Sequence, residues 1–577
     1  MVSGILFNSK TNGLIVDDYT NSSNLETTYE YSNWWWTDYE LISTESTLES
    51  KHLNIAADSV GNIHIVWADL TAYLGCGSDS DIFYKYWDAT SDSWSTTEVV
   101  STESTSYSSY PALAVDSTNK IHIVWIDTTD YAGAGTDLDI FYKSRSSEGL
   151  WSITEVVSPT SDDSLKPSIA VDSADNLHLV WQDITDYLGS GTDSDVFYRI
   201  RPSGSIWSTT EVVSSGSTGS SYNPFIVVNS LNTAYITWQD TTDYLGAGTD
   251  WDIFYRFKTY VSGVWSFTGI VSAESTLDSA VPSMVVDSAD NIHCVWYDST
   301  DYSGSGTDVD IFYKYRDVSS YAWTTTEVVS TESTDNSFYA FIDVDSTDTL
   351  HLVWKDETDY LGSGSDVDVF YKYRDASSGS WSLTSVVTTE STTSVNWGVI
   401  AVDNLDNIHV SWEVSGDFLG SGTDWDIYHK KFVGPPSAPE FLAAAPNYST
   451  TGSISLNWSD VRRTDSYYLY RETTYMTSSI GLTPIVKIND SNFVDTIDAS
   501  GTYYYAVIAE NEYGNSSLSP VEDVQVDSTN SLLPFLSNEL LIVAGILLGT
   551  QIIFFIISIL IKKPSGKSTA KSSKKKK

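Results

Sequence analysis

Short runs of alternating hydrophobic and polar residues, separated by Ser, Thr, Asp and Gly, make up the chain from residue 36 to residue 432. One stretch contains four such runs in order: WSTTEVVS, PALAVD, KIHIVWID and LDIFYKSR, between residues 94 and 145. Alternation with a period of two, bounded by turn-forming residues, is typical of β-strands, and no helical period accompanies it. The pattern therefore predicts units of four short strands.

These units repeat along the chain. Each contains a run related to KIHIVW, and the Trp that closes this run recurs every 56 to 58 residues, at positions 67, 125, 181, 238, 296, 354 and 412. Repetition of a four-stranded unit is typical of a β-propeller, with a linear solenoid as the alternative. A first Trp-starting run at Trp36 precedes the other runs, and the last unit lacks one. We therefore predict an all-β, seven-bladed β-propeller closed by an N-terminal strand.

A different pattern follows the repeats. The linker VGPPSAP interrupts them, and the next segment carries Trp458 in SISLNWSD and an alternating run, YYYAVIAENEYGN. This segment resembles a fibronectin type III domain, which implies a β-sandwich that acts as a spacer. The predicted boundaries are an N-terminal segment 1–33, the propeller 34–432, a linker 433–438, the type III domain 439–528, a linker 529–539, a membrane helix 540–561 and a tail 562–577.

The C-terminal segments carry the membrane prediction. Residues 540–561 are 22 consecutive uncharged, mostly apolar positions, enough to cross a bilayer, with a buried soluble helix as the alternative. Eight lysines follow, which favours a cytoplasmic tail and an extracellular N-terminal region. The first 20 residues do not resemble a signal peptide. Either a leader is missing from this chain, which we favour, or the protein is tail-anchored and faces the cytosol.

Charge narrows the range of partners. The chain has 77 acidic and 30 basic residues, for a net charge of -47, so a phosphate-binding surface and a nucleic-acid partner are excluded. Aromatic residues make up 13%, which is compatible with a folded chain. Two cysteines, Cys76 and Cys294, are too few for a disulfide scaffold.

The turns after the third run of each unit suggest a relationship. RSSEGLW (residues 145–151), RDASSGSW (374–381) and WDATSDSW (87–94) are degenerate forms of the Asp-box turn. By these turns the repeats resemble those of sialidase-type propellers. The Arg-Ile-Pro start of sialidases does not occur in this chain. The resemblance implies the propeller fold and, as an alternative function, a glycan-acting hydrolase.

The loops between the second and third runs, called the acidic loops below, repeat D-x-T-D-Y-x-G-x-G-T-D-x-D. Several carboxylates with intervening glycines could present oxygen ligands to Ca²⁺, or could simply form good turns. We predict calcium as the candidate cofactor. Its candidate ligands are Asp127, Asp130, Asp137, Asp139, Asp183, Asp186, Asp193, Asp195, Asp298, Asp301, Asp308 and Asp310.

Each acidic loop also carries an aromatic residue. Because equivalent loops of a propeller share one face, the acidic loops predict a binding face for a glycan or a basic protein partner. The alternative is that the tyrosines pack inward and hold the loops. The candidate ligand-binding residues are Tyr131, Tyr187, Tyr244, Tyr302 and Tyr360.

The remaining candidate functional groups are interpreted as structural. Six histidines share one repeat position, which places one in each of six units and disfavours a shared zinc ion. No residue that breaks the repeat has a partner suited to catalysis, so the sequence predicts a protein that is not an enzyme. We expect a membrane-anchored surface protein of an archaeon or a bacterium that mediates adhesion through the acidic face. A passive envelope component is a further alternative.

Overall fold

A computed structural model describes residues 35–527, except residues 245, 260, 361, 365, 392, 417–420, 435, 437, 462–463 and 512–513. These residues form two compact units, one ending at Val433 and the other beginning at Gly434. The described residues contain β-strands and no α-helix. Among them there is accordingly no helix long and apolar enough to cross a membrane. The predicted membrane segment 540–561 lies outside the described residues.

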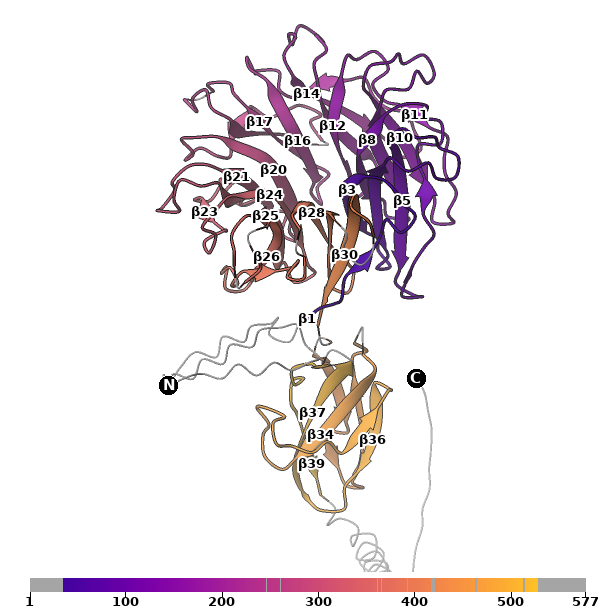
Figure 1. The fold of residues 1–577 in the computed structure, drawn as a ribbon. Helices are drawn as coiled ribbons and strands as arrows, with labels where there is room; N and C mark the ends of the chain where they lie inside the picture. Colours follow the sequence, from indigo (N-terminus) through magenta and orange to yellow (C-terminus); the bar gives the residue numbers. More distant parts are fainter. Residues whose placement is uncertain are drawn as a thin grey trace, which may run out of the picture. The chain divides into compact units, whose positions relative to one another are not determined.

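The first unit contains seven antiparallel sheets (Figure 1). The innermost strands are β3 (Ser50–Ala57), β8 (Ser108–Val115), β12 (Ser164–Val171), β16 (Ser221–Val228), β20 (Ser279–Val286), β24 (Ser337–Val344) and β28 (Val395–Val402). The second strands are β4 (Ile63–Asp69), β9 (Ile121–Asp127), β13 (Leu177–Asp183), β17 (Ala234–Asp240), β21 (Ile292–Asp298), β25 (Leu350–Asp356) and β29 (Ile408–Ser415).

The third strands are β5 (Asp81–Asp88), β10 (Asp139–Arg145), β14 (Asp195–Arg201), β18 (Asp252–Lys258), β22 (Asp310–Arg316), β26 (Asp368–Arg374) and β30 (Trp425–Val433). Short outer strands complete six of the sheets: β6 (Ser93–Trp94), β7 (Glu98–Val99), β11 (Glu155–Val156), β15 (Glu211–Val212), β19 (Gly269–Ile270), β23 (Glu327–Val328) and β27 (Ser385–Val386). In the remaining sheet, β1 (Trp35–Trp36) and β2 (Glu40–Leu41) pair with β30.

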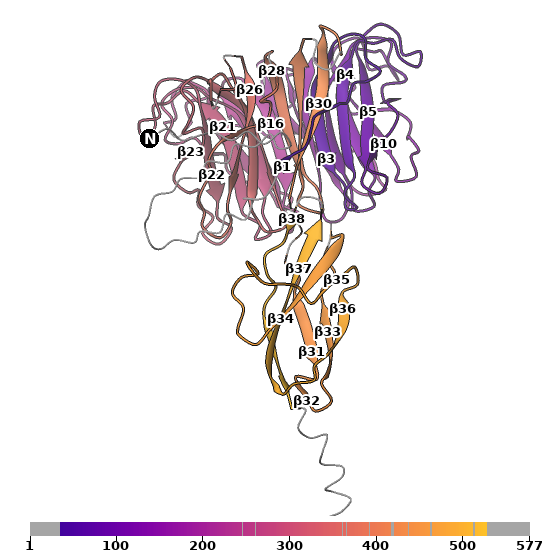
Figure 2. The same ribbon diagram turned by 60° about the horizontal axis from the view of Figure 1, so that its bottom comes forward.

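The sheets stand side by side around a common axis (Figures 1 and 2). Each innermost strand contacts the innermost strand of the next sheet, and β28 contacts β3. The Asn404 side chain also donates a hydrogen bond to the Ser59 carbonyl oxygen, which links the last sheet to the first. The prediction of an all-β chain built from repeated four-stranded, propeller-like sheets is confirmed.

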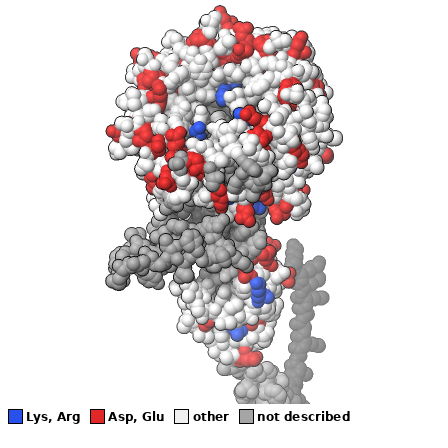
Figure 3. All heavy atoms as spheres, in the orientation of Figure 1, with Lys and Arg blue, Asp and Glu red and all other residues white. Residues whose placement is uncertain are grey.

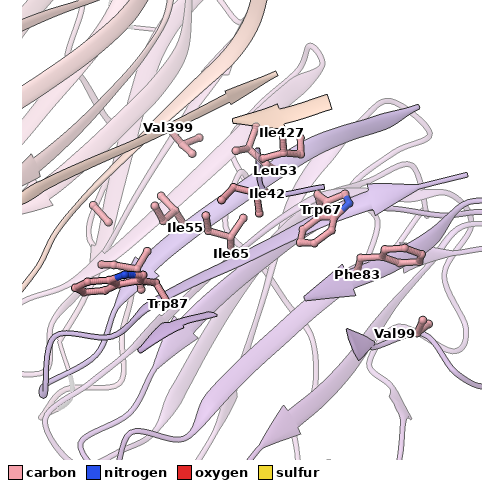
Figure 4. Packing of buried hydrophobic residues seen from close by; sticks show 12 residues of the cluster. Ile42, Leu53, Ile55, Ile65, Trp67, Phe83, Trp87, Val99, Val399 and Ile427 are labelled. Atoms are coloured by element: carbon pink, nitrogen blue, oxygen red, sulfur yellow. The ribbon is translucent and has the colours of Figure 1, made fainter. Parts of the chain in front are cut away.

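Hydrophobic side chains fill the spaces between neighbouring sheets. Figure 4 shows the cluster where Trp67 and Phe83 of the first sheet pack near Val399 and Ile427 of the last, with Ile42 between them. The repeated Trp of the second strand is buried in every sheet. In six of the sheets its indole N–H donates to the Asp two residues later, as Trp125 does to Asp127 at 3.0 Å, whereas Val414 stands at that position after Trp412. The repeated Trp-x-Asp thus combines burial of a large ring with a satisfied polar group.

The six repeated histidines are structural, as predicted. His122 is buried, with Nδ1 at 2.9 Å from the Tyr142 hydroxyl and Nε2 at 3.1 Å from Asp116. The same Asp, His and Tyr arrangement recurs at His64, His178, His293 and His351. His409 contacts Asp403 and His429 instead.

The second unit is a two-sheet sandwich. One sheet contains β31 (Phe441–Ala445), β33 (Ser453–Trp458) and β36 (Asn492–Thr496). The other contains β32 (Tyr448–Ser449), β34 (Ser466–Glu472), β35 (Val486–Ile488), β37 (Gly501–Asn511), β38 (Gly514–Asn515) and β39 (Glu522–Val526). Trp458 of one sheet and Leu469 and Val507 of the other share a buried core, as expected of a sandwich.

Candidate active site

Every innermost strand is interrupted at the same place. In β3, Lys51 pairs with Ala68 and Asn54 pairs with Val66, so His52 and Leu53 both lie opposite one residue of β4. This is a β-bulge, a feature that redirects side chains and is common beside active sites. Equivalent register shifts occur in β8, β12, β16, β20, β24 and β28.

The third residue of each innermost strand has a positive φ. The angles lie between 44° and 56°, in the left-handed region that non-glycine residues rarely adopt. Backbone strain of this kind clusters at functional sites. Unlike the rest of the repeat, the side chain at this position varies widely between sheets: the seven residues are His52, Tyr110, Lys166, Asn223, Val281, Tyr339 and Trp397, called the inner ring below.

The inner ring surrounds a pocket. A cavity of about 110 Å³ is lined by His52, Tyr110, Lys166, Asn223, Val281 and Trp397 of the ring, and by four prolines that follow ring residues. Phe225 and Phe341, two positions further along their strands, also line it. Among the described residues, those that line this pocket include no Asp or Glu.

Aromatic and cationic groups stack inside the pocket. The ring of His52 lies 3.8 Å from that of Tyr110, centroid to centroid, with 24° between their planes. The Lys166 ammonium lies 3.8 Å from the centroid of Tyr110 and 5.2 Å from that of Trp397. Contacts of this kind stabilise a cation that is largely withdrawn from water. The pocket therefore places one imidazole, one phenol and one ammonium group within reach of a single ligand.

Hydrogen bonds hold His52 in place. Its Nδ1 lies 2.7 Å from the Ser109 hydroxyl, and its backbone N–H donates to Oε1 of Glu413, which is fully buried. Oε2 of Glu413 accepts from the Asn396 amide at 3.1 Å. Glu413 lies on β29 of the last sheet, so it positions a residue of the first.

Burial changes the protonation of these groups. It lowers the pKa of His52 to about 4, with Lys166 and Lys51 adding to the effect, so its imidazole is neutral at pH 7. It lowers the pKa of Lys166 to about 8, although Glu413 opposes the shift. It raises the pKa of Tyr110, which keeps its proton. It also raises the pKa of Glu413 to about 7. Several perturbed groups in one cleft are typical of a catalytic site.

The pocket is cationic although the protein is acidic. Figure 3 shows Lys and Arg atoms around the hollow of this face and Asp and Glu atoms spread over the surrounding rim. Besides Lys166, Lys355 lies 4.8 Å from the ring of Tyr339, one of the inner ring. A local positive field within a negative surface favours an anionic ligand that the pocket can enclose.

The tyrosines predicted to bind ligand lie elsewhere, in the acidic loops. Each packs on the Phe of the neighbouring third strand, with ring centroids 5.8 to 6.2 Å apart, and is partly buried. This is the inward packing that the sequence left open as the alternative. The residues are Tyr131, Tyr187, Tyr244, Tyr302 and Tyr360.

The four predicted calcium ligands of each loop have different surroundings. Asp127, Asp183 and Asp298 are buried and accept from the Trp indole, a Ser hydroxyl and a backbone N–H. Asp130, Asp186 and Asp301 accept from the N–H of a loop glycine. Asp139, Asp195 and Asp310 are buried and accept from a Ser hydroxyl through one oxygen. Asp137, Asp193 and Asp308 place one oxygen against a loop glycine.

Among the described residues, no group of three or more His, Cys, Asp or Glu side chains is placed to share one metal ion. The calcium prediction therefore stays a prediction at this point.

The inner ring is what the sequence analysis missed. Its members stand at one position of the repeat, immediately before Pro in four units, where the residue type changes from unit to unit. A position-by-position comparison of the seven units would have revealed this variation. Residues that break the repeat therefore do line one pocket, which the sequence analysis did not recognise.

No protein-family model matches the chain, and no curated protein matches it. Among solved structures, an ulvan lyase is similar at 9% identity and a TM-score of 0.45, over 67% of this chain and 95% of that one. The intramolecular trans-sialidase from Ruminococcus gnavus is similar at 10% identity and a TM-score of 0.37, over 68% and 95%. An Fn3-like protein from Clostridium thermocellum is 24% identical over 16% of this chain and 95% of its own, with a TM-score of 0.14.

These comparisons correct one prediction. The sequence predicts a protein that is not an enzyme, because no residue that breaks the repeat was found with a partner suited to catalysis. The similar solved structures include polysaccharide lyases and trans-sialidases, which are enzymes. Repetition around an axis is therefore no ground for excluding an enzyme, and the prediction is withdrawn.

Proposed function

We propose that the protein is a glycan-acting enzyme that takes an acidic sugar of a polysaccharide into the inner-ring pocket. The observation that carries the proposal is the stack of His52, Tyr110 and Lys166 within one pocket. Aromatic faces suit the apolar faces of sugar rings, and an ammonium group suits a carboxylate or sulfate substituent. The proposal treats the seven sheets as a closed seven-bladed propeller, which the contact of β28 with β3 supports.

The residues present favour elimination over hydrolysis. Glycoside hydrolysis commonly uses two carboxyl groups on either side of the scissile bond. The described pocket lining has none, so the hydrolase alternative lacks its usual acid and base. Elimination from a uronate instead needs a cation beside the carboxylate, a base for the proton on the neighbouring carbon and an acid for the glycosidic oxygen.

Each role has a candidate in the pocket. Lys166 would hold the uronate carboxylate and stabilise the negative charge that develops there. Neutral His52 would take the proton from the carbon next to that carboxylate. The electron pair left behind forms a carbon–carbon double bond as the bond to the glycosidic oxygen breaks, and the Tyr110 hydroxyl would protonate that oxygen.

The test is to incubate the full-length protein with uronate polysaccharides and, separately, with sialylated oligosaccharides. Elimination creates an unsaturated sugar that absorbs in the ultraviolet, whereas hydrolysis releases saturated reducing ends only. Unsaturated product that is lost in Tyr110→Phe supports the proposal. Saturated products alone, or turnover that Tyr110→Phe leaves intact, would overturn it. Adhesion and membrane attachment through residues 540–561 are separate predictions that this experiment does not address.

A further inference from the structure

A second set of residues recurs at the start of the third strands, away from the pocket. Each acidic loop ends in Asp-x-Asp, and the second Asp of each is nearly or fully buried. These pairs are Asp79 and Asp81, Asp137 and Asp139, Asp193 and Asp195, Asp250 and Asp252, Asp308 and Asp310, Asp366 and Asp368, and Asp424 and Asp426.

In six of the pairs, one oxygen of the second Asp carboxylate is buried without a hydrogen-bond partner. In the fourth sheet, Oδ1 of Asp252 accepts from the Ser272 hydroxyl at 2.8 Å, whereas its Oδ2 is buried without a hydrogen-bond partner. Oδ2 of Asp250 is buried without a partner as well. Both members share this property in three pairs, the other two being Asp79 with Asp81 and Asp366 with Asp368. Asp195, Asp310 and Asp426 also have an unpartnered Oδ2.

The carboxylates of these pairs lie near other carboxylates, as the pair Asp250 and Asp252 shows. Burial raises the pKa of Asp252 to about 7, and Asp250, Asp298 and Asp278 add to the rise. Asp298 belongs to β21 of the next sheet, so the negative charge that acts on Asp252 comes from two sheets. An unpaired carboxylate in such surroundings is costly unless a proton or a cation accompanies it.

We propose that the Asp-x-Asp pairs bind a hard divalent cation, and that this cation is mainly calcium. Calcium accepts carboxylate, carbonyl and water oxygens in a flexible arrangement, so two carboxylates plus backbone and water oxygens suffice. The unpartnered Oδ2 atoms of Asp250 and Asp252 would be ligands. Asp240 and Asp243 of the same loop are not proposed as ligands, since both oxygens of Asp240 and Oδ1 of Asp243 already accept hydrogen bonds from the protein. This site is independent of the pocket and of the proposed function.

The experiment compares three full-length proteins after removal of metal with a chelator. Calorimetric titration with CaCl₂ should give more than one ion bound per wild-type chain. The double variant Asp250→Asn/Asp252→Asn should bind one ion fewer, and the control Asp243→Asn, in the same loop, should bind as many as the wild type.

Thermal unfolding of the wild type gives a second readout that needs no variant. A ligand that binds only the folded state raises the melting temperature. Calcium should therefore raise it at matched ionic strength, and magnesium, which demands a stricter geometry, should raise it less. If calcium gives no heat of binding and does not change the melting temperature, the proposal is overturned, because the buried aspartates would then simply hold protons. Equal loss of sites in Asp243→Asn and in the double variant would overturn the assignment of ligands.

Discussion

The backbone N–H of His52 donates a hydrogen bond to the buried carboxylate of Glu413, joining residues 361 positions apart in the sequence. His52 lies on β3 of the first sheet and Glu413 on β29 of the last, so this bond crosses the junction between these two sheets. It also fixes the strained residue that contributes an imidazole to the pocket. The fold and the proposed chemistry thus depend on the same junction.

Lys166 is expected to provide the charge that binds an acidic sugar. Replacement by Met keeps much of the side-chain volume and removes the ammonium group. Charged hydrogen bonds contribute about 1.5–3 kcal/mol, so Lys166→Met should weaken binding of a uronate oligosaccharide about 10- to 100-fold. Calorimetric titration measures this. Lys120→Met, on the lysine that precedes β9, is the control and should bind as the wild type does.

Tyr110 is expected to act in the chemical step. Tyr110→Phe retains the ring that stacks on His52 and loses the hydroxyl. Loss of a general acid should lower kcat about 100- to 10,000-fold with little change in KM. Tyr187→Phe, in an acidic loop, should leave kcat unchanged. A similar decrease of kcat in both variants would contradict the assignment of the chemical step to the pocket.

The pH dependence of kcat/KM follows from two pKa values. His52, with a pKa near 4, must be unprotonated to accept a proton, so activity should rise as pH increases through about 4. Lys166, with a pKa near 8, must be protonated to bind the acid, so activity should fall as pH increases through about 8. Lys166→Arg should move the upper limit to higher pH, because a guanidinium stays charged. An upper limit that does not move would exclude Lys166 as its cause.

Ile42 is expected to stabilise the junction between the first and last sheets. It is fully buried, and its N–H donates to the carbonyl oxygen of Ile427 on β30. Truncation of such a side chain costs about 2–5 kcal/mol, so Ile42→Ala should lower the melting temperature of the propeller unit. Ile153→Ala, at a side chain that is 78% exposed, should leave it unchanged. Equal melting temperatures for both variants would show that this junction contributes little to stability.

The sequence predicted the architecture because the forces that build it repeat. A Trp such as Trp125 recurs in each unit and packs between neighbouring sheets, and in six of the seven units an Asp two residues later accepts its indole N–H. The histidines could be recognised as structural for the same reason, since six residues that lie one to a sheet cannot meet at one metal ion.

The pocket could not be predicted in the same way. His52, Tyr110 and Lys166 are separated by more than 50 residues and come together only because bulges turn the third residue of each innermost strand. Their identities vary where the rest of the unit repeats, so a search for shared patterns passes over them. The sequence also could not show which aspartates of an acidic loop are the proposed ligands. That depends on which carboxylate oxygens have no hydrogen-bond partner in the folded protein.

The most direct measurement is a crystal structure of the full-length protein with a uronate oligosaccharide bound. The account predicts a sugar ring inside the inner ring, with its carboxylate within hydrogen-bonding distance of Lys166 Nζ and the Tyr110 hydroxyl directed at a glycosidic oxygen. A sugar bound instead on the acidic loops, against Tyr187 or its equivalents, with the pocket holding none, would contradict it.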